Sequence, residues 1–439
     1  MMKIPRRIAS VIINSLGGGV VPRIGLPYIT VGREREISAL LSDLENVGEG
    51  GASFRFIVGK YGSGKSFLLQ SVRNYAMDKG FVVADADLSP ERRLCGTKGQ
   101  GLATYRELMR NLSTKTRPES GALSLLLDRW LSEVRTSVAA EYGIADTDSR
   151  EFHTLVENKI YAAVSSLREM VHGFDFAVLM KRYFIADCEA DDEAKAAVLK
   201  WFRGEYQSKS DVKQALGINI MITDDNWYDY IKLFAGFFRS AGYKGLIILI
   251  DELVNLYKIP NLITRQYNYE KLLMMYNDVL QGRASGIGII MCGTLQCVED
   301  TRRGLYSYEA LRSRLAAGKF SDEKHYDIMS PIIRLAPLSY EEMLVLAEKL
   351  ADIHAVCRGY ERRISEQELI LFIKTEFSRV GAQTNITPRE VIRDLIELLN
   401  ILSSNPDTTA KELLGSGDFS FSGPYCGDNE SENFAEFEI

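Results

Sequence analysis

The sequence of 439 residues is poor in cysteine and histidine, and it lacks long apolar runs. Its six cysteines are scattered, without the density of a disulfide framework or the paired spacing of a zinc site. Its four histidines show no ligand spacing. The longest aliphatic run, Leu246 to Ile250, is far shorter than the roughly 20 residues that span a bilayer. We therefore expect reduced thiols, a cytoplasmic location and no membrane partner.

The sequence also lacks an excess of positive charge. Lys and Arg number 53, Asp and Glu number 59, and the formal net charge is -6. Six of the acidic side chains follow Gly417, where no Lys or Arg occurs, which leaves 53 charges of each sign in residues 1–417. A neutral body with an acidic end argues against a strongly basic nucleic-acid binder. Any contact with DNA should be weak and should fall with salt, because backbone phosphates dominate unspecific affinity.

Short apolar runs alternate with helical periodicity along the chain, a pattern typical of an α/β fold with a parallel sheet. The connection between the second and third apolar runs is about 150 residues long, so it must carry structure of its own. Helical periodicity within it and after Pro337 predicts two helical modules. The predicted strands, each apolar enough to be covered on both faces, are 54–58, 81–84, 246–250, 287–292 and 332–335.

These patterns predict an order of domains along the chain. The residues after about 403 are rich in Ser, Gly, Asp and Glu, a composition that buries too little apolar surface to become ordered, so we expect a disordered tail. The expected parts are an N-terminal segment (1–30), an α/β core in two parts (31–94 and 245–336), a helical insertion (95–244), a helical lid (337–402) and the acidic tail (403–439).

One glycine-rich stretch carries a specific motif. Gly59 to Ser66, GKYGSGKS, matches G-x-x-x-x-G-K-[ST] between a predicted strand and a predicted helix, the context typical of a phosphate-binding loop. Lys65 would reach the β and γ phosphates of ATP, and Ser66 would offer its hydroxyl to Mg²⁺. The alternative is a glycine-rich turn with an exposed lysine. The expected nucleotide-binding residues here are Gly59, Lys60, Tyr61, Gly62, Ser63, Gly64, Lys65, Ser66 and Phe67.

Two carboxylates follow the third predicted strand. Asp251 and Glu252 come directly after the apolar run 246–250, and ligands of open α/β sheets lie at such strand ends. Asp251 would belong to the shell of Mg²⁺, and Glu252 would orient and deprotonate an attacking water. Alternatively, Asp251 caps the next helix.

Two other positions could contact the same nucleotide. Thr294 follows Gly293 after the fourth predicted strand and could bind the γ phosphate or the water, although it could be an ordinary turn threonine. Thr387, Pro388 and Glu390 predict a helix start, in which the cation of Arg389 opposes the helix dipole. A nearby phosphate would explain Arg389, and pairing with Glu390 or with solvent is the alternative.

Two arginines lie between the fourth and fifth predicted strands. Arg312 or Arg314 could reach the γ phosphate bound by a neighbouring subunit, as an arginine finger does. This hypothesis requires a homo-oligomer. A solvated helix face is the alternative for both side chains.

The order of phosphate loop, acidic strand end, threonine strand end and helical lid resembles the AAA+ ATPases, in particular the origin-recognition initiator branch. The stretch GRERE (32–36) is similar to the adenine-side motif of that branch. The resemblance implies the following roles: Gly32 and Arg33 line the base pocket, Thr294 is sensor 1, Arg389 is sensor 2, and Arg314 is the finger, with Arg312 as the nearby substitute.

A closer resemblance covers most of the chain. Besides the phosphate loop and the acidic pair, SLGGGVVP (15–22), YRELMRNL (105–112), CGT (292–294) and EALRSRL (309–315) are similar to the BrxC/BrxD-type ATP-binding proteins of bacterial BREX antiphage systems. The resemblance implies phage defence, acting on DNA with a helicase or another defence protein as partner.

These observations lead to competing functional hypotheses. The first is a Mg²⁺-dependent ATPase that hydrolyses ATP at subunit interfaces. The second is a nucleotide-gated scaffold or switch that recruits defence partners with little turnover. A P-loop kinase or transferase is the third, and it needs an acceptor pocket that the sequence does not display.

Overall fold

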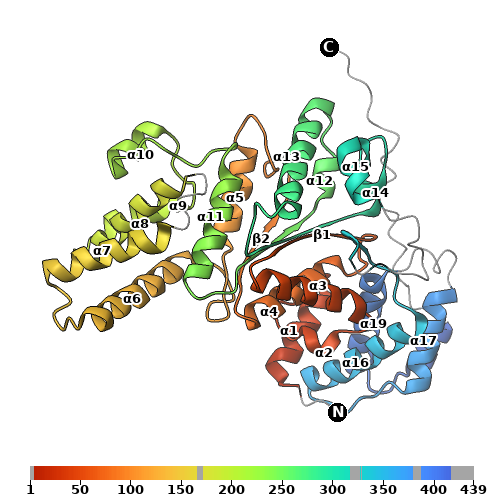
Figure 1. The fold of residues 1–439 in the computed structure, drawn as a ribbon. Helices are drawn as coiled ribbons and strands as arrows, with labels where there is room; N and C mark the ends of the chain where they lie inside the picture. The colour runs from red at the N-terminus through yellow and green to blue at the C-terminus, as the bar shows by residue number, and fades with distance from the viewer. Residues whose placement is uncertain (1–3, 166–171, 317–326, 328, 379–386, 417–439) are drawn as a thin grey trace. The chain divides into compact units, whose positions relative to one another are not determined.

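The computed structural model describes residues 4–165, 172–316, 327, 329–378 and 387–416 (Figure 1). The chain divides into two compact units. The first, which we call the lid unit, consists of 1–38, 58–71 and 334–439. The second, which we call the sheet unit, consists of 39–57 and 72–333.

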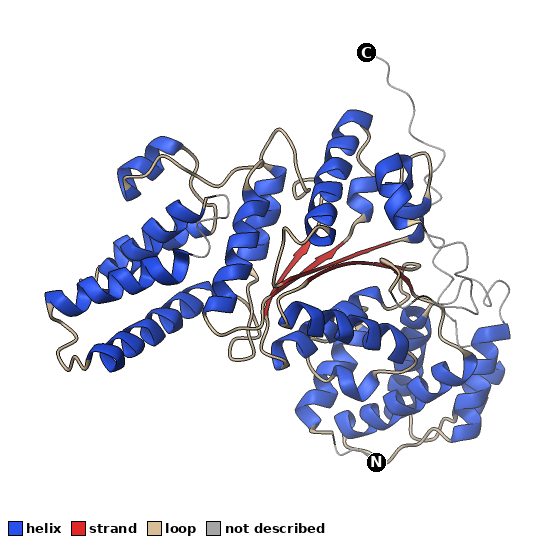
Figure 2. Ribbon diagram, in the orientation of Figure 1, coloured by secondary structure: helices blue, strands red, loops and turns tan. Residues whose placement is uncertain are grey.

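A five-stranded sheet of order β2-β3-β4-β1-β5 organises the α/β core (Figure 2). β2 is parallel to β3, and β3 is parallel to β4. The predicted α/β fold with a parallel sheet is confirmed, and each predicted strand forms with small shifts at its ends. The strands are β1 (Ala52–Val58), β2 (Val82–Asp87), β3 (Leu246–Asp251), β4 (Ile287–Gly293) and β5 (Ile332–Arg334).

Apolar runs decide where these strands form. In β3 the first five residues are buried, and in β4 all seven are, as expected for strands with both faces covered. The helices that accompany the strands are α3 (Glu34–Gly48), α4 (Lys65–Asp78), α12 (Val254–Tyr257), α13 (Leu262–Leu280), α14 (Leu295–Glu299), the 3₁₀ turn η1 (Leu305–Ser307) and α15 (Glu309–Leu315).

The long connection between β2 and β3 is helical. Its core is aromatic: the Trp130 ring lies 5.1 Å from that of Phe237, and Phe176 contacts Phe202, Phe234 and Phe237. The connection therefore has a core of its own, as its length requires. Its helices are α5 (Gln100–Arg110), α6 (Leu123–Tyr142), α7 (Arg150–Ser165), α8 (Gly173–Cys188), α9 (Asp192–Phe202), α10 (Lys209–Leu216) and α11 (Trp227–Ser240).

The lid unit is built around a helical core. Its N-terminal helix packs against α16 and α19, so residues 4–30 share one apolar cluster with the C-terminal helices. The capping box of Ser339 and Glu342 starts α16, as the sequence predicts. The helices are α1 (Arg6–Gly17), α2 (Leu26–Ile29), α16 (Tyr340–Arg358), α17 (Glu366–Ser378), α19 (Pro388–Ser404) and α20 (Ala410–Ser416).

The predicted tail begins too early. Residues 403–416 are ordered: α19 continues to Ser404, and α20 follows. Ala410 is buried, and Leu413 and Leu414 pack against the core of the lid unit. The expectation of disorder was wrong here because an average over 403–439 hides this short apolar stretch. The remainder of the predicted tail, 417–439, lies outside the described residues.

Among the helices that the structure describes, none combines the length and the apolar character needed to cross a bilayer.

A buried histidine makes the lid unit sensitive to acid. His354 Nδ1 lies 2.7 Å from the Tyr360 hydroxyl, and Nε2 lies 3.2 Å from Asn400 Oδ1, which also accepts from Arg358. Since an amide oxygen only accepts, Nε2 carries the proton and Nδ1 accepts from Tyr360. Burial lowers the pKa of His354, Asn400 opposes this shift, and the charge of Arg358 supports it.

We predict that His354→Gln lowers the free energy of unfolding at pH 8 by about 1–3 kcal/mol, because buried partners lose hydrogen bonds. Below the ordinary histidine pKa of about 6.5, the unfolded wild type binds a proton that folded His354 does not take up, so the wild type loses stability. The variant has no such group. Thermal unfolding midpoints from pH 8 to pH 5 should therefore converge, and a gap that widens on acidification would contradict this assignment.

Candidate nucleotide-binding site

The phosphate loop lies between β1 and the start of α4 in the lid unit. Gly62 and Gly64 have φ values of +77° and +97°, a backbone conformation that residues with a Cβ rarely adopt. Lys65 folds back across the loop, and its Nζ donates to Gly59 O at 3.0 Å and to Lys60 O at 2.8 Å. The ammonium group is thereby held at the beginning of the loop, where a loop of this type places the β and γ phosphates.

Three other loop side chains have different surroundings. Ser66 lies in the first turn of α4 with an exposed side chain, accessible to a cation. Ser63 Oγ is buried and has no hydrogen-bond partner among the described residues. Phe67 packs against the apolar core of the lid unit, so its ring anchors the start of α4.

Gly32 and Arg33 connect this loop to the lid helices. Gly32 has a φ of +66°, and a Cβ there would collide with the carboxylate of Glu342 in the capping box of α16. Arg33 is 5% exposed, and its guanidinium donates to Ser63 O at 3.1 Å and to Ala336 O at 2.9 Å. The Arg33 guanidinium thus holds the loop through protein carbonyls, and the predicted place of Gly32 and Arg33 at a base stays a prediction.

The start of α19 meets the same loop. Thr387, Pro388 and Glu390 form the predicted capping box with proline in the first turn. A Cβ on Gly62 would lie 2.6 Å from Thr387 Oγ1. Arg389 Cζ lies 4.7 Å from the centre of the Tyr61 ring, a cation–π contact that neither alternative for Arg389 anticipated. The lid unit therefore brings together the loop, Arg33 and Arg389.

The sheet unit holds the acidic pair. Asp251 ends β3, and its Oδ1 accepts from Glu252 N at 2.8 Å. Glu252 has a φ of +60°, a left-handed conformation that costs a non-glycine residue on the order of 1–3 kcal/mol. The next helix, α12, has no side-chain cap at its start, so Asp251 does not cap it.

Asp87 is a candidate that the sequence analysis missed. It ends β2, directly opposite Asp251 in the parallel register. Desolvation by the surrounding protein, together with the charge of Asp251, raises the pKa of its carboxyl group. The signal was available: Asp85 and Asp87 alternate at the end of the second strand, which we ended at residue 84.

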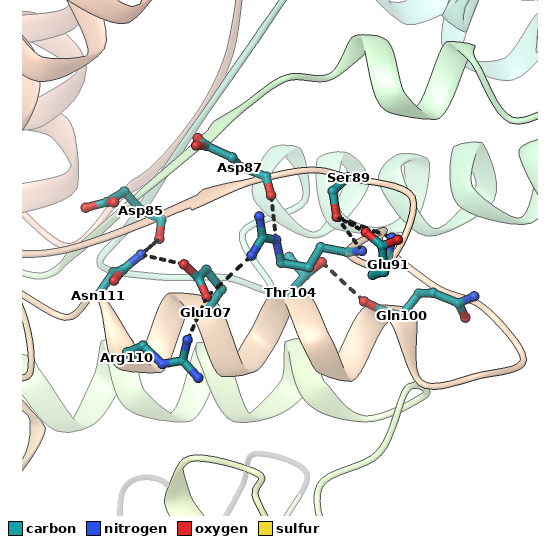
Figure 3. Close-up of polar contacts among 10 residues, drawn as sticks. Asp85, Asp87, Ser89, Glu91, Gln100, Thr104, Glu107, Arg110 and Asn111 are labelled. Carbon is teal, nitrogen blue, oxygen red and sulfur yellow. Dashed lines mark hydrogen bonds and ion pairs between the residues drawn. The ribbon is translucent and has the colours of Figure 1, made fainter. Parts of the chain in front are cut away.

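Contacts to α5 hold the end of β2 (Figure 3). Asn111 donates to Asp85 O at 2.9 Å and Arg92 Nε donates to Asp87 O at 2.9 Å, and Arg92 also pairs with Glu107 at 3.7 Å. These bonds fix the backbone at the end of β2, where Asp87 lies.

Mg²⁺ is commonly held by one or two carboxylates together with substrate phosphates. The pair Asp87 and Asp251 fits that chemistry, although the described residues contain no cluster of three or more metal-binding side chains.

Thr294 directly follows β4, the strand that pairs with β3. Its hydroxyl caps α14 by accepting from Cys297 N at 3.3 Å, so it resembles the turn threonine of the alternative hypothesis. The hydroxyl hydrogen remains able to donate to another acceptor.

Both arginines of α15 are exposed, as a solvated face requires. Arg314 donates to Asn277 Oδ1 at 2.9 Å and to Ala310 O at 2.7 Å. For the guanidinium of Arg312 the described part of the chain supplies no hydrogen-bond or ion-pair partner.

The phosphate loop and the parallel α/β sheet define the class: a P-loop nucleotide-binding protein. Residues 4–418 match the family described as BREX system ATP-binding protein BrxC/D. The chain therefore belongs to this family of ATP-binding proteins of the BREX antiphage system.

Solved structures similar to this chain include domain III of the replication initiation protein DnaA from Thermotoga maritima. That domain is 12% identical, the match covers 91% of this chain and 98% of that one, and the TM-score is 0.37. No curated protein matches the sequence.

We predict that Gly62→Ala weakens ATP binding more than Gly64→Ala. Both substitutions force alanine into the left-handed region, which costs about 1–2 kcal/mol or roughly tenfold in Kd, and only Gly62 also collides with Thr387. Calorimetric titration with Mg²⁺-ATP measures both effects. Gly143→Ala is the matched control, because Gly143 has a φ of +65° with open space around it in the insertion. Wild-type affinity in Gly62→Ala would refute the prediction.

Proposed function

We propose that this protein is a Mg²⁺-dependent ATPase. The observation that carries the proposal is the backbone of Glu252, a non-glycine residue held at a φ of +60° directly after Asp251. Strain of this kind persists only where surrounding structure imposes it, and it clusters at active sites. The phosphate loop and membership in an ATP-binding family supply the substrate.

Each residue then has a chemical task. Loop N–H groups and Lys65 neutralise the β and γ phosphates, and Ser66 and Asp251 would provide oxygen ligands for Mg²⁺. Bound Mg²⁺ would supply positive charge to the phosphate oxygens as charge develops on them.

Glu252 accepts a proton from a water whose oxygen attacks the γ phosphorus. The bond from that phosphorus to the bridging oxygen breaks, and ADP leaves with the electron pair. Thr294 orients the water or the γ phosphate, and Arg389 contacts the γ phosphate.

The base pocket needs a revised proposal. Gly32 and Arg33 would shape the adenine side indirectly, because Gly32 admits the start of α16 and Arg33 holds the loop through Ser63 O. A direct contact between Arg33 and the base would require its carbonyl bonds to break.

We predict that Glu252→Gln keeps ATP affinity and lowers turnover by about 10²- to 10⁴-fold, because the amide keeps the shape but is not a base. Phosphate release and calorimetry on the same preparation separate turnover from binding. Glu270→Gln on α13, also an exposed carboxylate, is the matched control.

Unchanged turnover in Glu252→Gln would reject Glu252 as the base, and absence of phosphate release by the wild type would reject the ATPase. Nucleotide-dependent partner capture that this substitution leaves intact would instead favour the scaffold or switch. Release of phosphate to water without an acceptor would dispose of a kinase or transferase.

We also propose that the chain acts as a homo-oligomer in which one subunit completes its neighbour's site. Arg314 matches the finger position of related ATPases, but its guanidinium is tied to Asn277 and Ala310. Arg312 is exposed on the same helix and would reach outward without giving up these bonds. Both remain candidates, and the experiment must separate them.

We predict that alanine at the true finger lowers turnover by about 10³- to 10⁵-fold and leaves ATP binding nearly unchanged. Mixing that variant with Glu252→Gln should restore part of the activity, because a site with an intact glutamate then meets a neighbour with an intact arginine. Alanine at the other arginine is the control. Native mass measurement with and without ATP establishes whether subunits associate, and no recovery in confirmed mixed oligomers contradicts a shared site.

The target of the ATP cycle is also proposed. Membership in a BREX family supports work in phage defence, and we propose DNA as the target, with a helicase or another defence protein as partner. The equal numbers of charges in residues 1–417 support only a weak, salt-sensitive contact with DNA.

A further inference from the structure

The phosphate loop carries an exposed aromatic side chain that its motif does not require. Tyr61 occupies a position where the motif accepts any residue, and it is 50% exposed. The part of the side chain that stays in water contributes no hydrophobic stabilisation. The ring does have a contact: Arg389 Cζ lies 4.7 Å from its centre.

The position of this contact along the loop is informative. Lys65 Nζ donates hydrogen bonds to the carbonyls of Gly59 and Lys60. This places the ammonium group at the beginning of the loop, where the β and γ phosphates are expected. Tyr61 is the next residue. Arg389 therefore holds its positive charge beside the part of the loop that distinguishes ATP from ADP.

Two features fix this arrangement. The absence of a side chain at Gly62 admits Thr387 at the start of α19, so the backbone of Arg389 is close to the loop. A free arginine side chain samples many rotamers, and a contact that restricts them reduces the entropy lost on ligand binding. An aromatic ring attracts the guanidinium while leaving N–H groups available to donate to phosphate.

We propose that Tyr61 is a positioning residue that holds Arg389 at the γ-phosphate end of the loop and thereby favours ATP over ADP. This inference rests on the proposed role of Arg389. The competing explanation is that Tyr61 only stabilises the loop conformation, in which case ATP and ADP would be affected alike.

The test compares Tyr61→Leu, Tyr61→Phe and Tyr61→Trp by titration with ADP and with a non-hydrolysable ATP analogue, both with Mg²⁺. Leucine should weaken binding of the analogue about two- to fivefold relative to ADP, the size of an exposed cation–π contact. Phenylalanine and tryptophan keep an aromatic face and should restore the wild-type ratio. Tyr142→Leu, at a residue 55% exposed in the insertion, should leave both affinities unchanged.

A double-mutant cycle with Arg389→Ala identifies the route of the effect. In the Arg389→Ala background, Tyr61→Leu should no longer change the ratio. Three outcomes would overturn the role of Tyr61 while leaving the ATPase proposal intact. Tyr61→Leu could still change the ratio in the Arg389→Ala background, or it could weaken both nucleotides equally. It could also leave the ratio unchanged although Arg389→Ala changes it. An unchanged ratio in Arg389→Ala itself would remove the proposed role of Arg389, and the Glu252→Gln turnover assay tests the ATPase independently.

Discussion

The space left by the missing side chain of Gly62 is the constraint on which the lid unit depends. At this position the backbone is left-handed and Thr387 lies where a Cβ would be, so no other residue permits both the loop and the approach of α19. Because α19 approaches there, Arg389 can lie over Tyr61. Gly32 plays the same part for α16, since its missing side chain makes room for Glu342. Two glycines thus connect nucleotide-loop geometry to two lid helices.

Arg33 shows why a buried cation can have a structural task beside a nucleotide loop. Burying a guanidinium is costly unless its donors are paired, and Arg33 pairs with Ser63 O, Ala336 O and Glu36. Since Ser63 belongs to the loop and Ala336 precedes α16, one side chain couples their positions. Loop conformation and lid conformation are therefore not independent in this unit.

Much of the fold and part of the site could be predicted from local signals. Apolar runs located the strands, and the capping boxes located the starts of α16 and α19, because each signal acts within a few residues. The contact between Tyr61 and Arg389 joins positions 328 residues apart, and no local pattern contains it. For Asp87 the alternation with Asp85 is a local signal, but its place opposite Asp251 depends on the register of the assembled sheet. Helix α20 (410–416) packs against the apolar core of the lid unit, and the composition of the segment itself contains no information on that core.

The carboxylates of Asp87 and Asp251 show how ATP and Mg²⁺ would depend on each other. Burial of the Asp87 carboxyl group raises its pKa, and the like charge of Asp251 on the adjacent strand end adds to this shift. A divalent cation near the pair would reverse that preference, since it favours the ionised form of both groups. Two carboxylates leave most of the octahedral shell of Mg²⁺ to water and phosphate oxygens. In the proposed ATPase, binding of the cation should therefore be strongest when a nucleotide supplies the remaining ligands.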